Sequence, residues 1–264
     1  MAKVLWLSDG ACLSTGYSSQ TLGLLNNLTD LGNETHFLQH TSPGMSTLPG
    51  TRLADGTELK FTTHRAGMQP YCQDIIEHKI RKLKPDVFGV LLDSFMLYPW
   101  ILNKDFAPAK SYFWFPSDGG GGLPLGCENV IRKFDTPVAM SRYAQRQAKD
   151  QYEIKTEYIP HAVDHKNFKP LTTEEKYAIK KKWGIADKFV IGTVARNQGR
   201  KMLDRTLRAF ALAAPHIPDA VLFLHSDPTD PAGYFDAHYM IHKLGIQNRV
   251  IWSGTKYYKP FDYN

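Results

Sequence analysis

The sequence has little cysteine and no long apolar run. Its 3 cysteines, Cys12, Cys72 and Cys127, lie far apart and form no C-x-x-C pair. Such an odd, scattered set argues against a disulfide framework and against a structural zinc site. No stretch approaches the roughly 18 apolar residues of a transmembrane helix. The first ten residues, MAKVLWLSDG, lack the apolar stretch and cleavage site of a secretory signal. These absences predict a protein of the reducing cytoplasm.

The composition is that of a globular protein with a basic balance. Hydrophobic residues make up 42% of the 264 residues and charged residues 22%, which suits one large domain or two small ones. The net charge of +6 at pH 7 favours anionic partners such as nucleotide sugars, acidic lipids or nucleic acid. No nucleic-acid-binding motif is present, so nucleic acid is not expected. The densest basic cluster, Lys180–Lys182, is either a solvated helix face or a peripheral contact with a membrane.

Strand and helix patterns alternate through the first half, which predicts a Rossmann-like domain. Lys3–Ser8 opens as a strand, a loop of small residues follows, and 17–31 has helical spacing with Gly32 as its stop. The loop is not G-x-G-x-x-G, so a dinucleotide site is poorly supported. Gly16 would let a ligand approach the backbone at the helix start, and an ordinary strand-to-helix turn is an equal alternative.

The remaining elements follow from the same periodicities, with residues 40–63 interpreted as a loop and a short hairpin. Ser141 is expected to cap one helix, and Thr172 with Glu175 to form a capping box on another. Strands are predicted at Thr35–Gln39, Asp86–Leu92, Ser111–Phe115, Thr136–Met140, Glu157–Ile159, Val221–Leu224 and Arg249–Trp252, and helices at Tyr71–Leu83, Arg142–Tyr152, Leu203–Ala214 and Tyr234–Leu244.

The most unusual composition lies in residues 116–124, PSDGGGGLP. Ordering four consecutive glycines costs much chain entropy, so such a loop is tolerated where the backbone must move or approach a ligand. Asp118 precedes the glycines, where it could orient a hydroxyl group or act as a base. A flexible surface loop with an Asp turn is the alternative. Asp93 ends another predicted strand, where it either faces a ligand or caps the next helix.

The second half is organised around residues 190–210. The apolar run VIGTVA at 190–195 is typical of a strand buried on both faces. A polar loop comes next, and apolar residues then recur at helical spacing from Leu203. Arg196 and Lys201 bracket the loop. A strand, a basic loop and a helix present backbone N–H groups and a positive dipole end to an anion, and this pair of cations suits a diphosphate. Two solvated surface cations are the alternative.

Residues 158–168, YIPHAVDHKNF, precede a charged helix and then VIGTVARNQGRK at 190–201. This arrangement resembles the domain junction of GT-B glycosyltransferases, and more narrowly the retaining family-four type that uses nucleotide-diphosphate sugars. Ala162 stands where that family usually has glycine. The resemblance runs from near Val4 to Asn264. It implies an α/β, GT-B-like fold with two Rossmann-like domains and parallel sheets, the second incomplete.

The resemblance also implies how the chain is divided. Residues 1–163 would form an N-terminal Rossmann-like domain on the acceptor side. Residues 164–186 would be an interdomain connection and helix. His161, just before this segment, would be either structural or at most cleft-lining. Residues 187–264 would be part of a C-terminal nucleotide-sugar-binding domain. That domain normally contains an acidic E-x7-E segment further on, and none follows here, so the chain is expected to be C-terminally truncated.

The function implied is a retaining transfer of a sugar from a nucleotide-diphosphate sugar to a sugar, lipid or protein acceptor. The nucleotide sugar is the donor substrate, and neither a metal nor another cofactor is obligatory. Asp118, Arg196 and Lys201 would be catalytic, with Arg196 and Lys201 binding the diphosphate. The other expected binding residues are Gly16, His225, Ser253 and Gly254. The alternatives are a non-catalytic nucleotide- or glycan-binding protein and a GT-B sugar-nucleotide epimerase.

Overall fold

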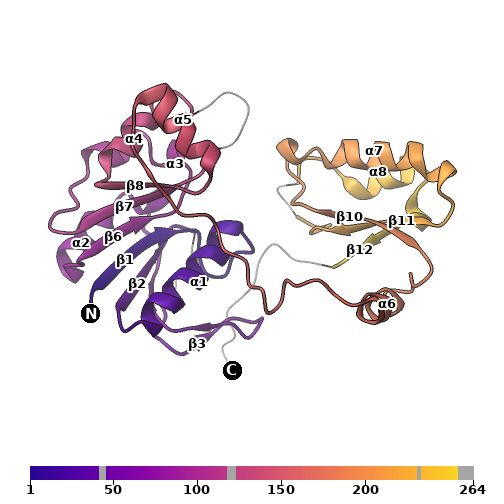
Figure 1. Cartoon of the computed structure of the whole chain (residues 1–264), viewed down its shortest axis with the longest axis horizontal. Coiled ribbons are helices and arrows are strands. Elements are labelled where there is room, and N and C mark those ends of the chain that lie inside the picture. Colours follow the sequence, from indigo (N-terminus) through magenta and orange to yellow (C-terminus); the bar gives the residue numbers. More distant parts are fainter. Residues whose placement is uncertain (42–45, 118–122, 231–232, 255–264) are drawn as a thin grey trace. The chain divides into compact units, whose positions relative to one another are not determined.

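The computed structural model describes residues 1–41, 46–117, 123–230 and 233–254. The chain forms two compact units, the first comprising Met1–Ala162 and the second starting at Val163. Both are built of parallel strands and helices, which confirms the predicted α/β class with two Rossmann-like sheets (Figure 1).

In the described part of the first unit, the main sheet has the order β5-β2-β1-β6-β7-β8-β9, and all neighbouring strands are parallel. The order reverses between β1 and β6, which is the switch point of a doubly wound sheet. The elements are β1 (Lys3–Ser8), α1 (Gly16–Asp30), β2 (Glu34–Gln39), β3 (Thr51–Arg52), β4 (Glu58–Leu59), β5 (Thr62–His64), α2 (Ile76–Leu83), β6 (Val87–Val90), α3 (Ser94–Leu97), β7 (Lys110–Phe115), α4 (Cys127–Lys133), β8 (Thr136–Ala139), α5 (Arg142–Tyr152) and β9 (Glu157–Tyr158).

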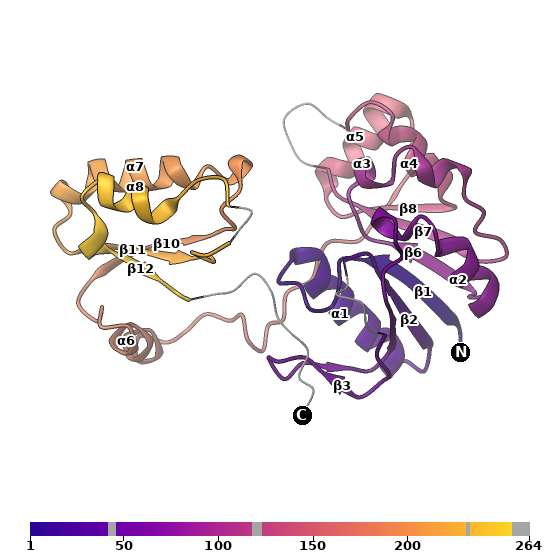
Figure 2. The same cartoon turned by 180° about the vertical axis from the view of Figure 1, so that it is seen from behind.

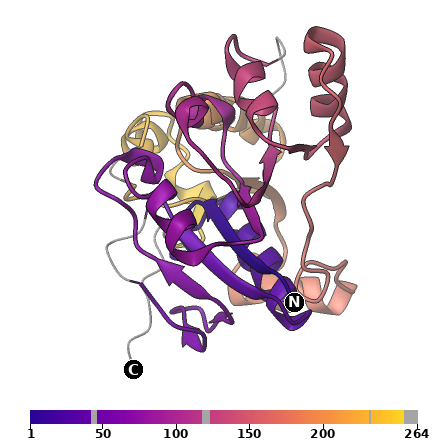
Figure 3. The ribbon, with the colours of Figure 1, turned by 90° about the vertical axis from the view of Figure 1, so that its left-hand side faces the viewer.

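The side chains of β1 alternate between two apolar layers, as expected for a strand covered on both faces. Leu5 and Leu7 are fully buried in the layer that α2, α3, α4 and α5 cover. Trp6 lies in the opposite layer, where Leu25 of α1 packs. Figure 3 shows β1 and α1 from another side, with the N-terminus marked. The alternating burial explains why the strand is apolar throughout.

Local backbone geometry corrects several predicted elements. The helix predicted from Tyr71 starts only at Ile76, because Tyr71 and Cys72 have φ of 56° and 60°, which no right-handed helix accommodates. The predicted hairpin is confirmed as the antiparallel pair β3 and β4. The parallel strand β5 was not predicted, nor were the helices α3 and α4, which are too short to give a periodic signal.

A glycine sits opposite a tryptophan at the centre of this sheet. Gly89 of β6 is the register partner of Trp6 on β1. A Cβ built on Gly89 would lie 2.1 Å from both Cε3 and Cζ3 of the Trp6 ring. Gly89 therefore has no room for a side chain, and its place in the run DVFGVLL depends on a neighbour 83 residues earlier in the chain.

A chain of titratable side chains lies at the β2–β5 side of the sheet. The Glu34 Oε1 atom is 2.8 Å from His36 Nε2, and His36 Nδ1 is 3.2 Å from His64 Nε2. Lys79 Nζ is 3.3 Å from His64 Nδ1. A charged Lys79 would donate a hydrogen bond to His64, His64 to His36, and His36 to Glu34. In this arrangement each neutral imidazole ring accepts one hydrogen bond and donates one. Burial, followed by the charges of Lys79 and His36, lowers the pKa of His64 to about 4.

We expect the chain to lose stability as the pH falls from about 6.5 towards 4. In this window the unfolded chain takes up a proton at His64 and the folded chain does not, so the free energy of unfolding decreases. The loss should reach about 1–2 kcal/mol, because His64 is only partly buried and solvent screens it. His64→Gln should flatten the dependence of the midpoint of thermal unfolding on pH between 7 and 5. His165→Gln, at an exposed position, is the control and should leave it unchanged.

The second unit has a three-stranded parallel sheet in its described part, in the order β10-β11-β12. The helices α7 and α8 cover one face, and α6 lies on the other (Figures 1 and 2). Leu207 of α7 and Ile241 of α8 are buried against Leu222 of β11. The elements are α6 (Thr173–Lys182), β10 (Phe189–Val194), α7 (Leu203–Ala213), β11 (Ala220–His225), α8 (Ala237–Lys243) and β12 (Val250–Trp252).

The prediction that strand 190–195 is buried on both faces was wrong. Among the described strands, β10 pairs only with β11 and lies at the edge of the sheet. Its end residues Phe189 and Val194 are 55% and 80% exposed, and none of its residues is buried. An apolar run indicates a strand but does not reveal whether that strand is central or peripheral.

Helix α6 begins and ends with the charge pattern that its dipole favours. The Thr172 hydroxyl accepts from the Glu175 N–H, and the Glu175 carboxylate accepts from the Thr172 N–H, which confirms the predicted capping box. Lys180–Lys182 form its last turn and are largely exposed. A membrane contact through these lysines stays a prediction. In the part of the chain that the structure describes, no helix combines the length and apolar character needed to cross a membrane.

Candidate functional site

The carboxyl ends of β10, β11 and β12 bring several predicted residues to one edge of the second-unit sheet. Val194 is in register with His225, and Leu224 with Trp252, so the three strands end together. Arg196 comes two residues after β10. In open α/β sheets this edge is the usual place for a ligand.

Arg196 is held by a carboxylate that the sequence did not indicate. Its Nε donates to Asp230 Oδ2 at 2.5 Å and its Nη2 donates to Asp230 Oδ1 at 3.0 Å. The Asp230 side chain is 2% exposed and that of Arg196 is 26% exposed. The carboxylate thus lies beneath the guanidinium, which keeps one part of its surface accessible. Such a fork-to-fork contact is among the stronger hydrogen-bonded ion pairs in proteins.

Asn197 ties the Arg196 loop to the segment before α8. Its Nδ2 donates to the Phe235 carbonyl at 2.7 Å, and its own carbonyl accepts from the Tyr234 N–H at 2.9 Å. Asn197 Oδ1 is buried and has no hydrogen-bond partner among the described residues. A Cβ on Gly233 would lie 3.0 Å from both Asn197 Nδ2 and the Asp230 carbonyl oxygen, so this position favours glycine.

These contacts explain why α8 is shorter than predicted. The periodicity suggested a helix from Tyr234, but Tyr234 and Phe235 lie in a bend and are hydrogen-bonded to Asn197. The helix starts at Ala237, after Asp236 accepts a hydrogen bond from the Tyr239 N–H at 2.9 Å as its N-cap.

Lys201 is exposed and lies in a 3-10 turn, Gly199–Lys201, between β10 and α7. Its backbone N–H donates to the Gln198 carbonyl at 2.9 Å. Met202, with φ of 49°, then turns the chain into α7. The predicted strand, basic loop and helix are therefore present, with this turn between loop and helix.

A polar hollow of about 420 Å³ opens beside Asp230, the ion-pair partner of Arg196, and beside Asn197. The rings of His238 and Trp252 lie along it, with centroids 5.3 Å apart and planes tilted by 38°. Carboxylates and an amide from the surrounding loops also line it: Asp227, Asp230, Asp236 and Asn197. The hollow offers flat rings and hydrogen-bonding groups, a combination that suits a polar organic ligand.

The other binding residues predicted in this half lie at the same strand ends. His225 is the exposed last residue of β11. Ser253 follows β12, and its N–H donates to the Leu224 carbonyl at 3.0 Å. Gly254 has φ of 73°, a conformation that favours glycine.

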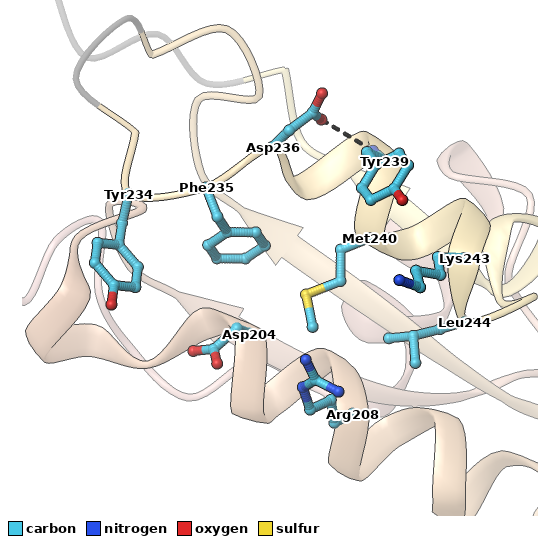
Figure 4. Close-up of a pocket in the computed structure, with 9 residues that line it drawn as sticks. All are labelled: Asp204, Arg208, Tyr234, Phe235, Asp236, Tyr239, Met240, Lys243 and Leu244. Carbon is cyan, nitrogen blue, oxygen red and sulfur yellow. Dashed lines mark hydrogen bonds between the residues drawn. The ribbon is translucent and has the colours of Figure 1, made fainter.

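A second hollow, of about 470 Å³, lies between α7 and α8 (Figure 4). Asp204 and Arg208 reach it from α7, and Tyr239, Met240, Lys243 and Leu244 from α8. Tyr234 stands at one end, and a Cβ on Gly199 would lie 3.2 Å from its ring. This hollow is mostly apolar, and no sequence motif indicated it.

In the first unit, the carboxyl ends of β1 and β2 carry a buried Asp–His pair. Asp9 Oδ1 lies 2.8 Å from His40 Nε2, and their side chains are 14% and 8% exposed. The Thr15 hydroxyl donates to Asp9 Oδ2 at 2.6 Å and accepts from the Ser18 N–H as the N-cap of α1. These bonds shape the loop that leads to Gly16, the first residue of α1.

Asp93 and His161 approach the same tyrosine. The Tyr17 hydroxyl donates to Asp93 Oδ1 at 3.0 Å. Asp93 occupies the N-cap position of α3, as the capping alternative expected, but its side chain makes no capping hydrogen bond to that helix. The His161 ring meets those of Tyr17 and Trp114 edge-on, and its Nε2 is buried without a hydrogen-bond partner among the described residues. Burial lowers the pKa of His161, which favours the neutral ring.

Asp118, the remaining predicted catalytic residue, lies outside the described residues. In the described ranges, no group of three or more His, Cys, Asp or Glu side chains could hold a metal ion.

Comparison with solved structures finds one fold at low sequence identity. HepE from Anabaena in complex with UDP-glucose matches with a TM-score of 0.70 and 13% identity, over 97% of this chain and 70% of HepE. The α,α-trehalose 6-phosphate synthase from Burkholderia multivorans matches with a TM-score of 0.64 and 12% identity, over 97% and 74% of the two chains. The catalytic domain of starch synthase IV from Arabidopsis thaliana, bound to ADP and acarbose, matches with a TM-score of 0.62 and 11% identity, over 97% and 74%.

Comparison of sequences alone finds less. No protein-family model matches the chain, and neither does any curated protein. The structural likeness nevertheless covers nearly the whole chain, and the parallel sheets agree with it. The chain therefore has the fold of GT-B glycosyltransferases.

Proposed function

We propose that this chain is a glycosyltransferase that moves a sugar from a nucleotide-diphosphate sugar to an acceptor hydroxyl. The fold supports this, because its structural neighbours include proteins solved with UDP-glucose and with ADP. The observation that carries the proposal is the place of Arg196. Its partly exposed guanidinium lies just past β10, at the sheet edge where α/β folds bind ligands.

Arg196 and Lys201 are proposed to bind the donor diphosphate. When the bond from the anomeric carbon to the diphosphate oxygen breaks, negative charge grows on the departing group. Two positioned cations stabilise that charge, so the proposed reaction has no obligatory need of a metal. Gly16, His225, Ser253 and Gly254 are proposed as further contacts to the nucleotide sugar, and Asp118 as a residue beside the acceptor. Retention of the sugar's configuration is part of the proposal.

A site that binds through a diphosphate should prefer nucleoside diphosphates over monophosphates. We expect UDP, ADP or GDP to bind at least about tenfold more tightly than the matching monophosphate, because the second phosphate contributes charge-assisted hydrogen bonds. Isothermal titration calorimetry on the full chain measures this for each base. Equal affinity for the di- and monophosphate of every base would contradict the assignment of Arg196 and Lys201.

Turnover separates an enzyme from a binding protein of the same fold. The chain is incubated with the sugar derivative of the best-binding diphosphate, and release of free nucleoside diphosphate is followed with and without a panel of sugar acceptors. The anomeric configuration of the product, read by NMR, tests retention. Tight diphosphate binding without turnover under these conditions would favour the non-catalytic alternative.

A further inference from the structure

The Asp230 carboxylate pairs directly with Arg196, a residue of the proposed diphosphate site. It accepts hydrogen bonds from both Nε and Nη2 of Arg196, at 2.5 and 3.0 Å. Its side chain is 2% exposed, and Arg196 covers it from the accessible side. A carboxylate this buried needs a cation with matching geometry, and the planar guanidinium provides two parallel donors where a lysine would provide one point charge.

The carboxylate is also fixed in space relative to β10. The Asp230 carbonyl accepts a hydrogen bond from the Gly233 N–H at 2.9 Å. Asn197, next to Arg196, binds the Tyr234 N–H and the Phe235 carbonyl a few residues later. The loop after β10 is thus joined to the segment before α8 by three residue pairs: Arg196–Asp230, Asn197–Tyr234 and Asn197–Phe235. Asp230 therefore holds the guanidinium in a defined position at the end of β10.

A long arginine side chain loses much rotational freedom when it binds a ligand. If that freedom is already lost in the free protein, the ligand does not have to supply the ordering free energy, and binding is tighter. The Arg196–Asp230 pair orders the arginine in this way, because the buried Asp230 holds a guanidinium that is still 26% exposed.

We propose that Asp230 is a positioning residue that fixes the Arg196 guanidinium for the diphosphate of the ligand. The inference rests on the proposed function, since it presupposes that Arg196 binds this diphosphate. It predicts the direction in which anion affinity changes when the Asp230 charge is removed. Removing a negative charge near an anion site would by simple electrostatics tighten anion binding. Removing a positioning residue weakens it.

The test measures UDP affinity by calorimetry for the wild type, Asp230→Asn, Arg196→Ala and the double variant, each as the full chain. We expect Asp230→Asn to bind UDP roughly tenfold more weakly, as loss of one preorganised side chain predicts. In the Arg196→Ala background, the same Asp230→Asn change should have no further effect. Asp219→Asn is the matched control, because it removes the same charge at an exposed position before β11 and should leave the affinity unchanged.

The outcomes separate the inference from the function that it rests on. If Arg196→Ala leaves UDP affinity unchanged, the diphosphate site itself is misassigned. If Arg196→Ala weakens binding but Asp230→Asn matches or exceeds wild-type affinity, the positioning role is overturned and the site stands. Independent, multiplicative losses from the two changes would likewise overturn it. Should Asp230→Asn fail to fold, Arg196→Lys provides the test: wild-type affinity with a lysine would overturn a role for the two-pronged pairing.

Discussion

Lys201→Ala should lower the rate of sugar transfer by roughly a hundredfold and leave the stability of the chain almost unchanged. The rate effect is expected because one positioned donor to a leaving group contributes about 10²–10³ in turnover. The stability is expected to stay within about 0.5 kcal/mol, because Lys201 is exposed and surface substitutions seldom cost more. Steady-state kinetics and thermal unfolding of the same preparation measure the two effects.

Lys188→Ala is the matched control for this variant. Lys188 is also exposed, but it lies just before the amino end of β10, whereas Lys201 lies beyond its carboxyl end. We expect wild-type kinetics from it. A similar loss of rate in both variants would indicate a general charge effect and would remove Lys201 from the proposed site.

Arg196→Ala differs from Lys201→Ala in a way that only the structure reveals. Taking away Arg196 leaves the carboxylate of Asp230 buried without its paired cation, which typically costs about 3–5 kcal/mol. A loss of activity in Arg196→Ala can therefore combine a functional and a structural effect. The double change with Asp230→Asn removes both charges and should recover part of the stability.

Gly89→Ala should strongly destabilise the first unit. Among the described glycines of this unit that face an aromatic ring, Gly89 has the least room for a methyl group. The new Cβ would lie 2.1 Å from two atoms of the Trp6 ring, and both residues are on central strands of the sheet. We expect a loss of about 3 kcal/mol or more, at the upper end of overpacking costs, because a rigid indole cannot bend away. Urea unfolding followed by circular dichroism measures it.

Two further variants test the cause of that loss. Trp6→Leu in the Gly89→Ala background replaces the ring and should make the double variant more stable than the sum of the single losses predicts. Gly23→Ala places a methyl group in α1 where nothing lies within 4 Å, and it should stabilise the chain by about 0.5–1 kcal/mol. Equal losses at Gly89 and Gly23 would rule out the steric explanation.

Elements with strong local signals could be predicted from the sequence. The helix Arg142–Tyr152 was predicted with both of its ends, and its Ser141 cap accepts a hydrogen bond from the Ala144 N–H at 2.9 Å. The GT-B fold was predicted from the junction motif and the alternation of strands and helices, and it is confirmed. These features depend on residues that are neighbours in the chain.

Features that depend on distant neighbours could not be predicted. Asp230 is 34 residues from Arg196, and only the register of β10 with β11 brings their loops together. Gly89 reads as an ordinary strand residue until Trp6 is placed opposite it. The periodicity also predicted that α8 starts at Tyr234. It carries no information on the hydrogen bond from the Tyr234 N–H to Asn197, which keeps this backbone out of the helix. The functional roles of Arg196, Lys201 and Asp118 stay predictions.

All three native thiols are buried, and this opens a route to optical measurements. Cys12, Cys72 and Cys127 are buried and take part in no disulfide, and burial raises the pKa of Cys72 to about 11 and that of Cys127 above its usual value. Maleimide dyes react with exposed thiolates, so they should pass over all three. Cysteines introduced at one surface position of each unit could then carry a donor and an acceptor fluorophore in the otherwise native chain. Energy transfer between them would show whether a nucleotide changes the separation of the two units.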